Sequence, residues 1–219
     1  MQRHDAWWFP DGETQLPRVM AAQAVRIEGR LVWQYHKYAA ALSLCTQRRL
    51  ALDIGAHVGL WSYWMAQDFL ELHAFEPVAA HRACWYANVT ALNATMHSYA
   101  LGATKAAVQL VTPSPETTGG TYVAPETTAF GDLQHPLDSF GFAEIDLVKI
   151  DCEGYEPAVI DGAVETLRRT RPVVVVEQHL QPGPSRYGFG PTAAVDRLTA
   201  LGMSVRTTLG SDVILEWGG

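Results

Sequence analysis

A turn that contains two glycines follows a short apolar run and holds the first residues that could bind a ligand. Asp53 lies near the end of this run, and Gly55, Ala56, His57 and Gly59 follow before a helical pattern begins. Glycines at the carboxyl end of a buried strand let the backbone approach a nucleotide closely. Many such turns contain glycine only because the chain packs tightly there. This motif alone therefore leaves both interpretations open.

A second carboxylate, at the end of the next apolar run, favours the ligand interpretation. Glu76, directly before Pro77, lies about twenty residues past the first glycine, where sheets of this type bind ribose hydroxyls. The turn lacks the G-x-G-x-x-G spacing that places a pyrophosphate on a helix N-terminus. Asp53 would repel phosphate and attract an ammonium group. Together the two motifs favour S-adenosylmethionine over NAD as the cofactor.

Four further residues follow the next two apolar runs and could take a proton from a methyl acceptor. Asp151 and Glu153 follow one run, and Glu177 and His179 follow the other. Residues two apart on a strand share a face, so these side chains should meet at adjoining strand ends. His179 is the first candidate for the general base because its unperturbed pKa is near neutrality. Glu153 could instead brace the turn that follows it. The cluster could also hold a divalent cation, but the sequence contains no compact ligand motif and we expect no metal.

An alternation of strand and helix patterns must position these residues. The expected strands cover residues 50–54, 72–75, 96–101, 145–150 and 172–176. The expected helices cover residues 60–69, 78–92, 157–168 and 191–201. Such an alternation predicts a parallel sheet with right-handed crossovers. The final residues, 203–209 and 212–217, predict an antiparallel hairpin.

Three segments depart from this alternation. The arm at the start is aromatic and rich in turn residues, so we expect no regular element there, and a helix should follow over residues 31–45. Residues 106–142 contain short β-prone pieces between Pro, Gly and Thr and predict an inserted hairpin or lid. Residues 181–190 read as a loop. We expect one domain over residues 1–219, with a catalytic core over residues 50–219.

Composition limits the partners. The 219 residues carry a formal net charge of -7, which disfavours binding to nucleic acid. No apolar stretch approaches the roughly 20 residues of a membrane helix. Three cysteines without paired spacing suggest neither disulfides nor a zinc site, and a reducing cytoplasm fits best. A small-molecule acceptor is the natural expectation, and the oligomeric state stays open.

These motifs resemble those of the FkbM family of methyltransferases. Residues 53–59 are similar to the D-x-G-A-N-x-G motif of class I methyltransferases, with His57 where Asn is commoner, and residues 74–77 read A-F-E-P. Residues 146–156 resemble the family hallmark D-x-x-K-I-D-x-E-G-x-E. Asn88 and Asn93 extend the resemblance. The opening and closing segments resemble bacteriophage-encoded members.

The resemblance implies a Rossmann-like α/β fold, with a mostly parallel seven-stranded sheet, helices on both faces and an antiparallel hairpin at the end. It implies S-adenosylmethionine as cofactor and O-methylation of a hydroxyl on a sugar or small metabolite. Methylation of a nucleotide, nucleic acid or protein, and a non-catalytic cofactor-binding module, remain alternatives. Asp151 could contact either the cofactor amine or the acceptor. The expected cofactor-binding residues are Asp53, Gly55, Ala56, His57, Gly59, Glu76, Pro77, Ala100, Leu101 and Asp151.

Overall fold

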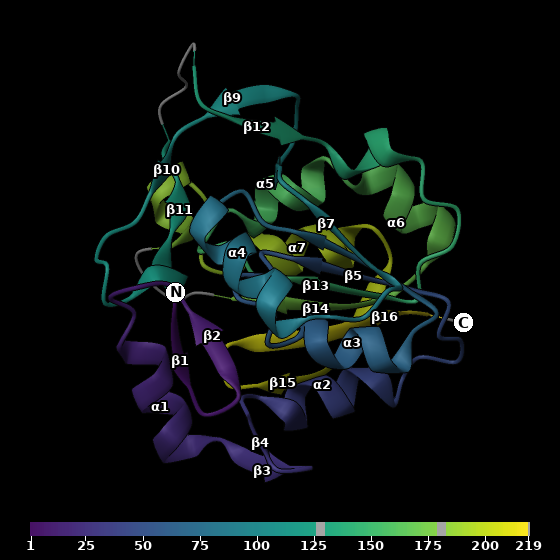
Figure 1. Ribbon diagram of the computed structural model, residues 1–219. Helices are drawn as coiled ribbons and strands as arrows, with labels where there is room; N and C mark the ends of the chain where they lie inside the picture. Colours follow the sequence, from purple (N-terminus) through teal and green to yellow (C-terminus); the bar gives the residue numbers. More distant parts are fainter. Residues whose placement is uncertain (126–129, 179–182, 219) are drawn as a thin grey trace.

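The computed structural model describes residues 1–125, 130–178 and 183–218, and a seven-stranded sheet lies at its centre (Figure 1). The strand order is β15-β16-β14-β13-β5-β6-β7. The parallel strands are β5 (Leu50–Ile54), β6 (Glu71–Phe75), β7 (Ala94–His97), β13 (Leu147–Ile150) and β14 (Val173–Glu177). Antiparallel to β14 runs β16 (Asp212–Trp217), which pairs with β15 (Met203–Leu209). The predicted Rossmann-like fold with its closing hairpin is confirmed.

Helices cover both faces of this sheet, because successive strand residues point to opposite sides. Leu52, Val148 and Val174 pack on one face against α5 (Glu156–Asp161), α6 (Val164–Thr170) and α7 (Ala193–Ala200). Ala51, Leu147 and Val175 pack on the other face against α2 (Tyr35–Leu42), α3 (Ser62–Asp68) and α4 (Ala79–Asn88). Apart from Asp53, Lys149 and the terminal Glu177, the central strands are therefore apolar, as strands buried on both faces must be.

The arm is more regular than its composition predicts. It contains the hairpins β1 (Gln2–His4) with β2 (Trp7–Phe9) and β3 (Val25–Ile27) with β4 (Arg30–Val32), and between them the helix α1 (Gln15–Gln23). The expected helix over residues 31–45 is wrong at its start, since α2 begins at Tyr35. Glu28 and Gly29 both have positive φ, as a tight hairpin turn requires, and the pairing of β3 with β4 overrides the helical pattern.

Two other expected elements are divided. The strand over residues 96–101 ends at His97, and Ala100–Leu101 form β8, which joins a smaller sheet with β12 (Asp132–His135) and β9 (Ala106–Val108). The helix over residues 157–168 separates into α5 and α6 at Gly162, where a Cβ atom would lie 2.1 Å from the Gly102 carbonyl oxygen. Between β9 and β12 lies the hairpin of β10 (Leu110–Val111) and β11 (Tyr122–Val123).

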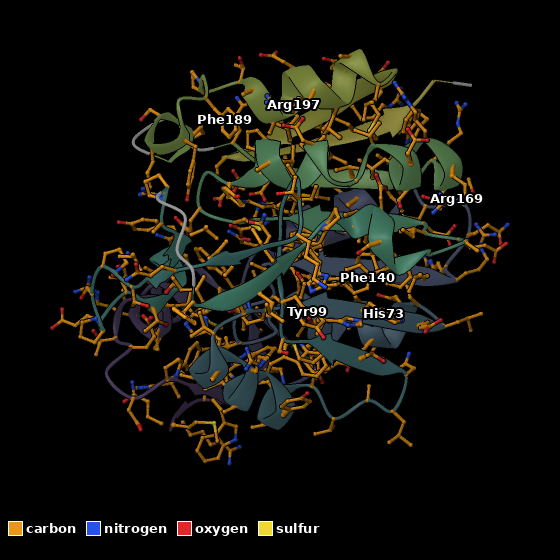
Figure 2. The ribbon with its side chains drawn as sticks, turned by 90° about the horizontal axis from the view of Figure 1, so that it is seen from above. His73, Tyr99, Phe140, Arg169, Phe189 and Arg197 are labelled. Atoms are coloured by element: carbon orange, nitrogen blue, oxygen red, sulfur yellow. The ribbon has the colours of Figure 1, made fainter. Side chains whose placement is uncertain are left out.

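An aromatic cluster fills the space between the edge of the large sheet and the short helix η2 (Leu137–Phe140), and Figure 2 shows His73, Tyr99 and Phe140 close together there. Nδ1 of His73 lies 2.7 Å from Nε2 of His97, whose ring stacks on Phe75. Burial lowers the pKa of His97 to about 4, with a smaller contribution from His73. In the described parts of the chain, no helix is long and apolar enough to cross a membrane.

Candidate functional site

A cavity of about 250 Å³ opens at the carboxyl ends of β5, β6, β13 and β14. Its walls come from these strand ends, from the arm and from the β10–β11 hairpin, which Figure 1 shows at the same end of the sheet. The expected residues that line it are Asp53, Gly55, Ala56, His57, Glu76, Pro77, Ala100, Leu101, Asp151, Glu153 and Glu177. The sequence motifs thus meet in one pocket.

Asp53 contributes a buried carboxylate to this pocket, with 1% of the residue exposed. Its Oδ2 accepts a hydrogen bond from Ser62 Oγ at 2.5 Å, whereas its Oδ1 has no hydrogen-bond partner among the described residues. Burial raises the pKa of Asp53, and the nearby Lys149 ammonium opposes that effect. A buried acceptor without a donor is costly, so Oδ1 suits a cationic or hydrogen-bonding group of a ligand.

The glycine turn lets the chain pass close to the next strand. Gly55 has a φ of +79°, and a Cβ atom there would lie 1.8 Å from the Asp151 carbonyl oxygen. Gly59 faces away from the cavity lining, because it packs on Trp85 and Val89, where a Cβ atom would come within 2.8 Å of both side chains. Gly55 therefore shapes the pocket, and Gly59 seats the turn on α4.

Glu76 organises the loops at the end of β6, next to the glycine turn. Its Oε2 accepts the His57 N–H at 2.9 Å, and its Oε1 accepts the Val78 N–H at 2.8 Å and lies 3.2 Å from His81 Nδ1. Oε2 keeps lone-pair capacity for a further donor, since a carboxylate offers about four acceptor positions. The arrangement can hold a hydroxyl group while it fixes the loop at His57.

His57 stands at the centre of a second set of contacts. Its φ is 48°, its Nε2 lies 3.1 Å from Thr118 Oγ1, and its ring meets His81 edge-on at 4.3 Å. Burial, together with the neighbouring His81, lowers the pKa of His57 well below its ordinary value. The imidazole is therefore neutral at physiological pH.

Three carboxylates form the other side of the pocket. Oxygen atoms of Asp151, Glu153 and Glu177 lie within 4.8 Å of one another. Asp151 Oδ2 accepts a hydrogen bond from Lys149 Nζ at 2.9 Å, and Glu177 Oε1 accepts one from Ser211 Oγ at the same distance. His179, the expected general base, lies outside the described residues.

Glu156 braces the turn after β13. Its Oε1 accepts hydrogen bonds from the N–H groups of Cys152 and Gly154 at 2.8 and 3.1 Å, and the residue is almost fully buried. Glu153 has a φ of 57° and faces the pocket. The second acid of the E-G-x-E motif thus positions the first.

Several further residues of the lining, most of them aromatic or polar, could not be identified from the sequence motifs. They are Leu16, Trp33, Gln34, His81, Tyr99, Tyr122 and Tyr155. His81 follows Glu76 by a little over one helical turn, a spacing that could have marked it. The others come from the arm, the inserted hairpin and loop positions, and their order along the chain carries no comparable signal.

Comparison with known proteins agrees with this geometry. The model of the FkbM methyltransferase domain matches residues 53–198. This range includes all of the strand-end motifs and ends before the final hairpin. The chain belongs to the FkbM methyltransferase family. Family and fold together identify it as an S-adenosylmethionine-dependent methyltransferase. No curated protein matches the chain.

Solved structures resemble this FkbM-family chain in fold. A putative O-methyltransferase from Klebsiella pneumoniae aligns with a TM-score of 0.53 and 17% identity, over 87% of this chain and 82% of its own. The O-methyltransferase from Bacillus cereus, solved in complex with SAH, aligns with a TM-score of 0.50 and 16% identity, over 92% and 88%. Methyltransferase FkbM from Methylobacillus flagellatus aligns with a TM-score of 0.49 and 16% identity, over 78% of this chain, which spans only 44% of that protein.

Asp146, the first acid of the family hallmark, has a structural role. Asp146 accepts hydrogen bonds from Arg49 through the backbone N–H at 2.7 Å and through the guanidinium Nε and Nη2 at 3.1 and 2.6 Å. This contact joins the starts of β5 and β13, far from the pocket. Within the motif, Asp146 and Glu156 hold the backbone, and Asp151 and Glu153 face the cavity.

Proposed function

We propose that the chain transfers a methyl group from S-adenosylmethionine to a hydroxyl of a neutral sugar or other small metabolite. The observation that carries the proposal is the division of the pocket. One side offers an unpartnered buried carboxylate oxygen on Asp53, next to the glycine turn. The other side offers three carboxylates whose oxygens lie within 4.8 Å of one another.

The first side fits the cofactor group by group. Asp53 Oδ1 suits the ammonium of the methionine part, and Glu76 suits the ribose hydroxyls. Pro77, Ala100 and Leu101 offer an apolar wall for the adenine ring. When bound, S-adenosylmethionine supplies an electrophilic methyl group on a positively charged sulfur.

The second side fits an acceptor that carries hydroxyl groups. Asp151, Glu153 and Glu177 could accept hydrogen bonds from such groups, hold one of them in line and take its proton as the methyl carbon passes from sulfur to its oxygen. Tyr122 and Tyr155 add aromatic surface that a sugar ring can cover. The formal net charge of -7 disfavours an acceptor that carries phosphate. Neutral acceptors are therefore favoured over nucleotides.

The test is incubation of the chain with methyl-labelled S-adenosylmethionine and three panels of acceptors: sugars and polyhydroxylated metabolites, nucleotides, and peptides. We expect label on hydroxyl oxygens of sugars or polyhydroxylated metabolites, and we expect the transfer to survive EDTA. Transfer only to nucleotides or peptides would refute the acceptor class. Cofactor binding without transfer to any panel would favour a binding module. Glu177→Gln and His179→Ala, each assayed as kcat against pH, would distinguish the candidates for the base.

A further inference from the structure

Glu13 is a buried carboxylate of the arm that lies outside the family match over residues 53–198. Only 1% of the residue is exposed. Its Oε1 accepts the Leu16 N–H at 2.9 Å, and its Oε2 accepts the N–H and the hydroxyl of Thr118 at 2.5 and 2.8 Å. A carboxylate with three donors is well satisfied although buried. It joins the arm to the insertion, 105 residues away in the sequence.

Thr118 continues this connection to the glycine turn. Because an ionised carboxylate can only accept, the Thr118 hydroxyl donates to Glu13 and keeps its lone pairs for His57 Nε2, 3.1 Å away. His57 Nε2 must then carry the ring proton, and Nδ1 is left as an acceptor. The lowered pKa of His57, caused by burial and by His81, agrees with this neutral tautomer.

Backbone contacts reinforce the same junction. The N–H groups of Thr14 and Gln15 donate to the Glu116 carbonyl oxygen at 3.2 and 3.0 Å. Directly after Thr118, a Cβ atom on Gly119 would lie 3.8 Å from His57 Cε1. Residues 13–16 and 116–123 therefore form one continuous wall, which we call the roof. Both of its parts contribute side chains or backbone to the cavity lining.

We propose that Glu13 is a positioning residue for the cofactor, because it fastens the roof to the glycine turn through Thr118 and His57. The inference rests on the proposed binding of S-adenosylmethionine. Glu76 holds the His57 N–H from one side, and Thr118 holds its ring from the other, so the junction fixes the loop that borders the cofactor. An intact junction therefore slows the dissociation of the bound cofactor.

Thr118→Val is the sharpest test, since it removes the hydroxyl, keeps the shape and preserves the backbone N–H that donates to Glu13. Thr118→Ser restores the hydroxyl. Glu116→Gln is the matched control, because its side chain is exposed and its backbone carbonyl oxygen, which accepts hydrogen bonds from the arm, is unchanged. The measurements are the dissociation rate of S-adenosylhomocysteine by stopped-flow tryptophan fluorescence, with Trp33 and Trp61 in the lining as reporters, and Kd by calorimetry.

We expect Thr118→Val to raise the dissociation rate about tenfold, because His57 loses its acceptor. Thr118→Ser and Glu116→Gln should stay within about twofold of the wild type. Glu13→Gln should act like Thr118→Val, since one carboxamide oxygen cannot serve both Leu16 and Thr118.

An unchanged rate in Thr118→Val would overturn the proposal. Equal acceleration in Thr118→Val and Thr118→Ser would also overturn it, because that result would mean that packing rather than the hydroxyl matters. A wild-type chain that binds no S-adenosylhomocysteine would instead refute the proposed cofactor, and this inference with it. The two failures are thus distinguished by the wild-type titration.

Discussion

Asp53→Asn removes one charge from the floor of the pocket with almost no change of volume, and we expect it to weaken cofactor binding. Asp53 Oδ1 has no hydrogen-bond partner in the described part of the chain, and an ammonium group that donates to it would make a charge-assisted hydrogen bond. Hydrogen bonds to charged groups contribute about 1.5–3 kcal/mol. Since each 1.4 kcal/mol is a factor of ten, the Kd for S-adenosylmethionine should rise about 10- to 150-fold.

Stability should respond in the opposite direction. Burial raises the pKa of Asp53 above its unfolded value, although Lys149 partly compensates. The contribution of such a carboxyl to stability is largest below its unfolded pKa and is lost as pH rises through its folded pKa. The amide in Asp53→Asn carries no such cost, and the variant should leave the Tm at pH 7 unchanged or raise it. Lys149 keeps its hydrogen bond to Asp151.

Calorimetry with two ligands isolates the contact. S-adenosylmethionine carries the ammonium, whereas 5′-methylthioadenosine keeps the adenosine and lacks the amino acid. Asp53→Asn should weaken only the first ligand. Glu76→Gln should weaken both, because its carboxylate supports the ribose side and two backbone N–H groups. Ser62→Ala is the control that keeps the charge. Equal losses for both ligands in Asp53→Asn, or no loss for either, would refute the assignment.

Three further changes have defined outcomes. Gly55→Ala should abolish cofactor binding and lower the Tm, because its Cβ atom would lie 1.8 Å from the Asp151 carbonyl oxygen; calorimetry that finds normal binding would contradict this. Lys37→Met leaves the Asp212 carboxylate buried without its ion pair, and urea titration should show a loss of about 3–5 kcal/mol in unfolding free energy; a loss under 1 kcal/mol would count against it. Burial lowers the pKa of His97 to about 4 from an ordinary 6.5, so on acidification the unfolded state binds the proton first. The Tm should therefore decrease as the pH is lowered from 6.5 to about 4. His97→Phe should flatten this fall, and parallel pH profiles would exclude the explanation.

Local sequence predicts the sheet well because its strands are buried on both faces. Leu50–Ile54 and Val173–Glu177 are apolar enough that no tertiary information is needed. The division of the helix at Gly162 could not be predicted, because its cause is the Gly102 carbonyl oxygen from a distant loop. The hairpin before Tyr35 could not be predicted because the periodicity of residues 31–45 favours a helix. In the structure, the turn at Glu28 and Gly29 instead brings the two strands of the hairpin together.

The site residues also fall into those that the local sequence predicts and those that depend on contacts between distant segments. Asp53 and Glu76 could be predicted because parallel strands end at one edge of the sheet, so a position in the chain translates directly into a position in the pocket. Glu13 and Thr118 meet across 105 residues, and only the packing of arm and insertion brings them together. The roles of Glu153 and Glu156 depend on backbone direction after β13, which spacing alone does not give.

Backbone conformation adds an independent reason to place function at this pocket. Three of its lining residues are not glycine and yet have left-handed φ values: 58° at Gln34, 48° at His57 and 57° at Glu153. Such conformations cost about 1–3 kcal/mol each and persist only where other contacts enforce them. Glu76 accepts the His57 N–H, and Arg186 donates to the Glu153 carbonyl oxygen at 3.0 Å. These three strained residues therefore gather at one cavity, where the surrounding contacts keep their side chains in the lining.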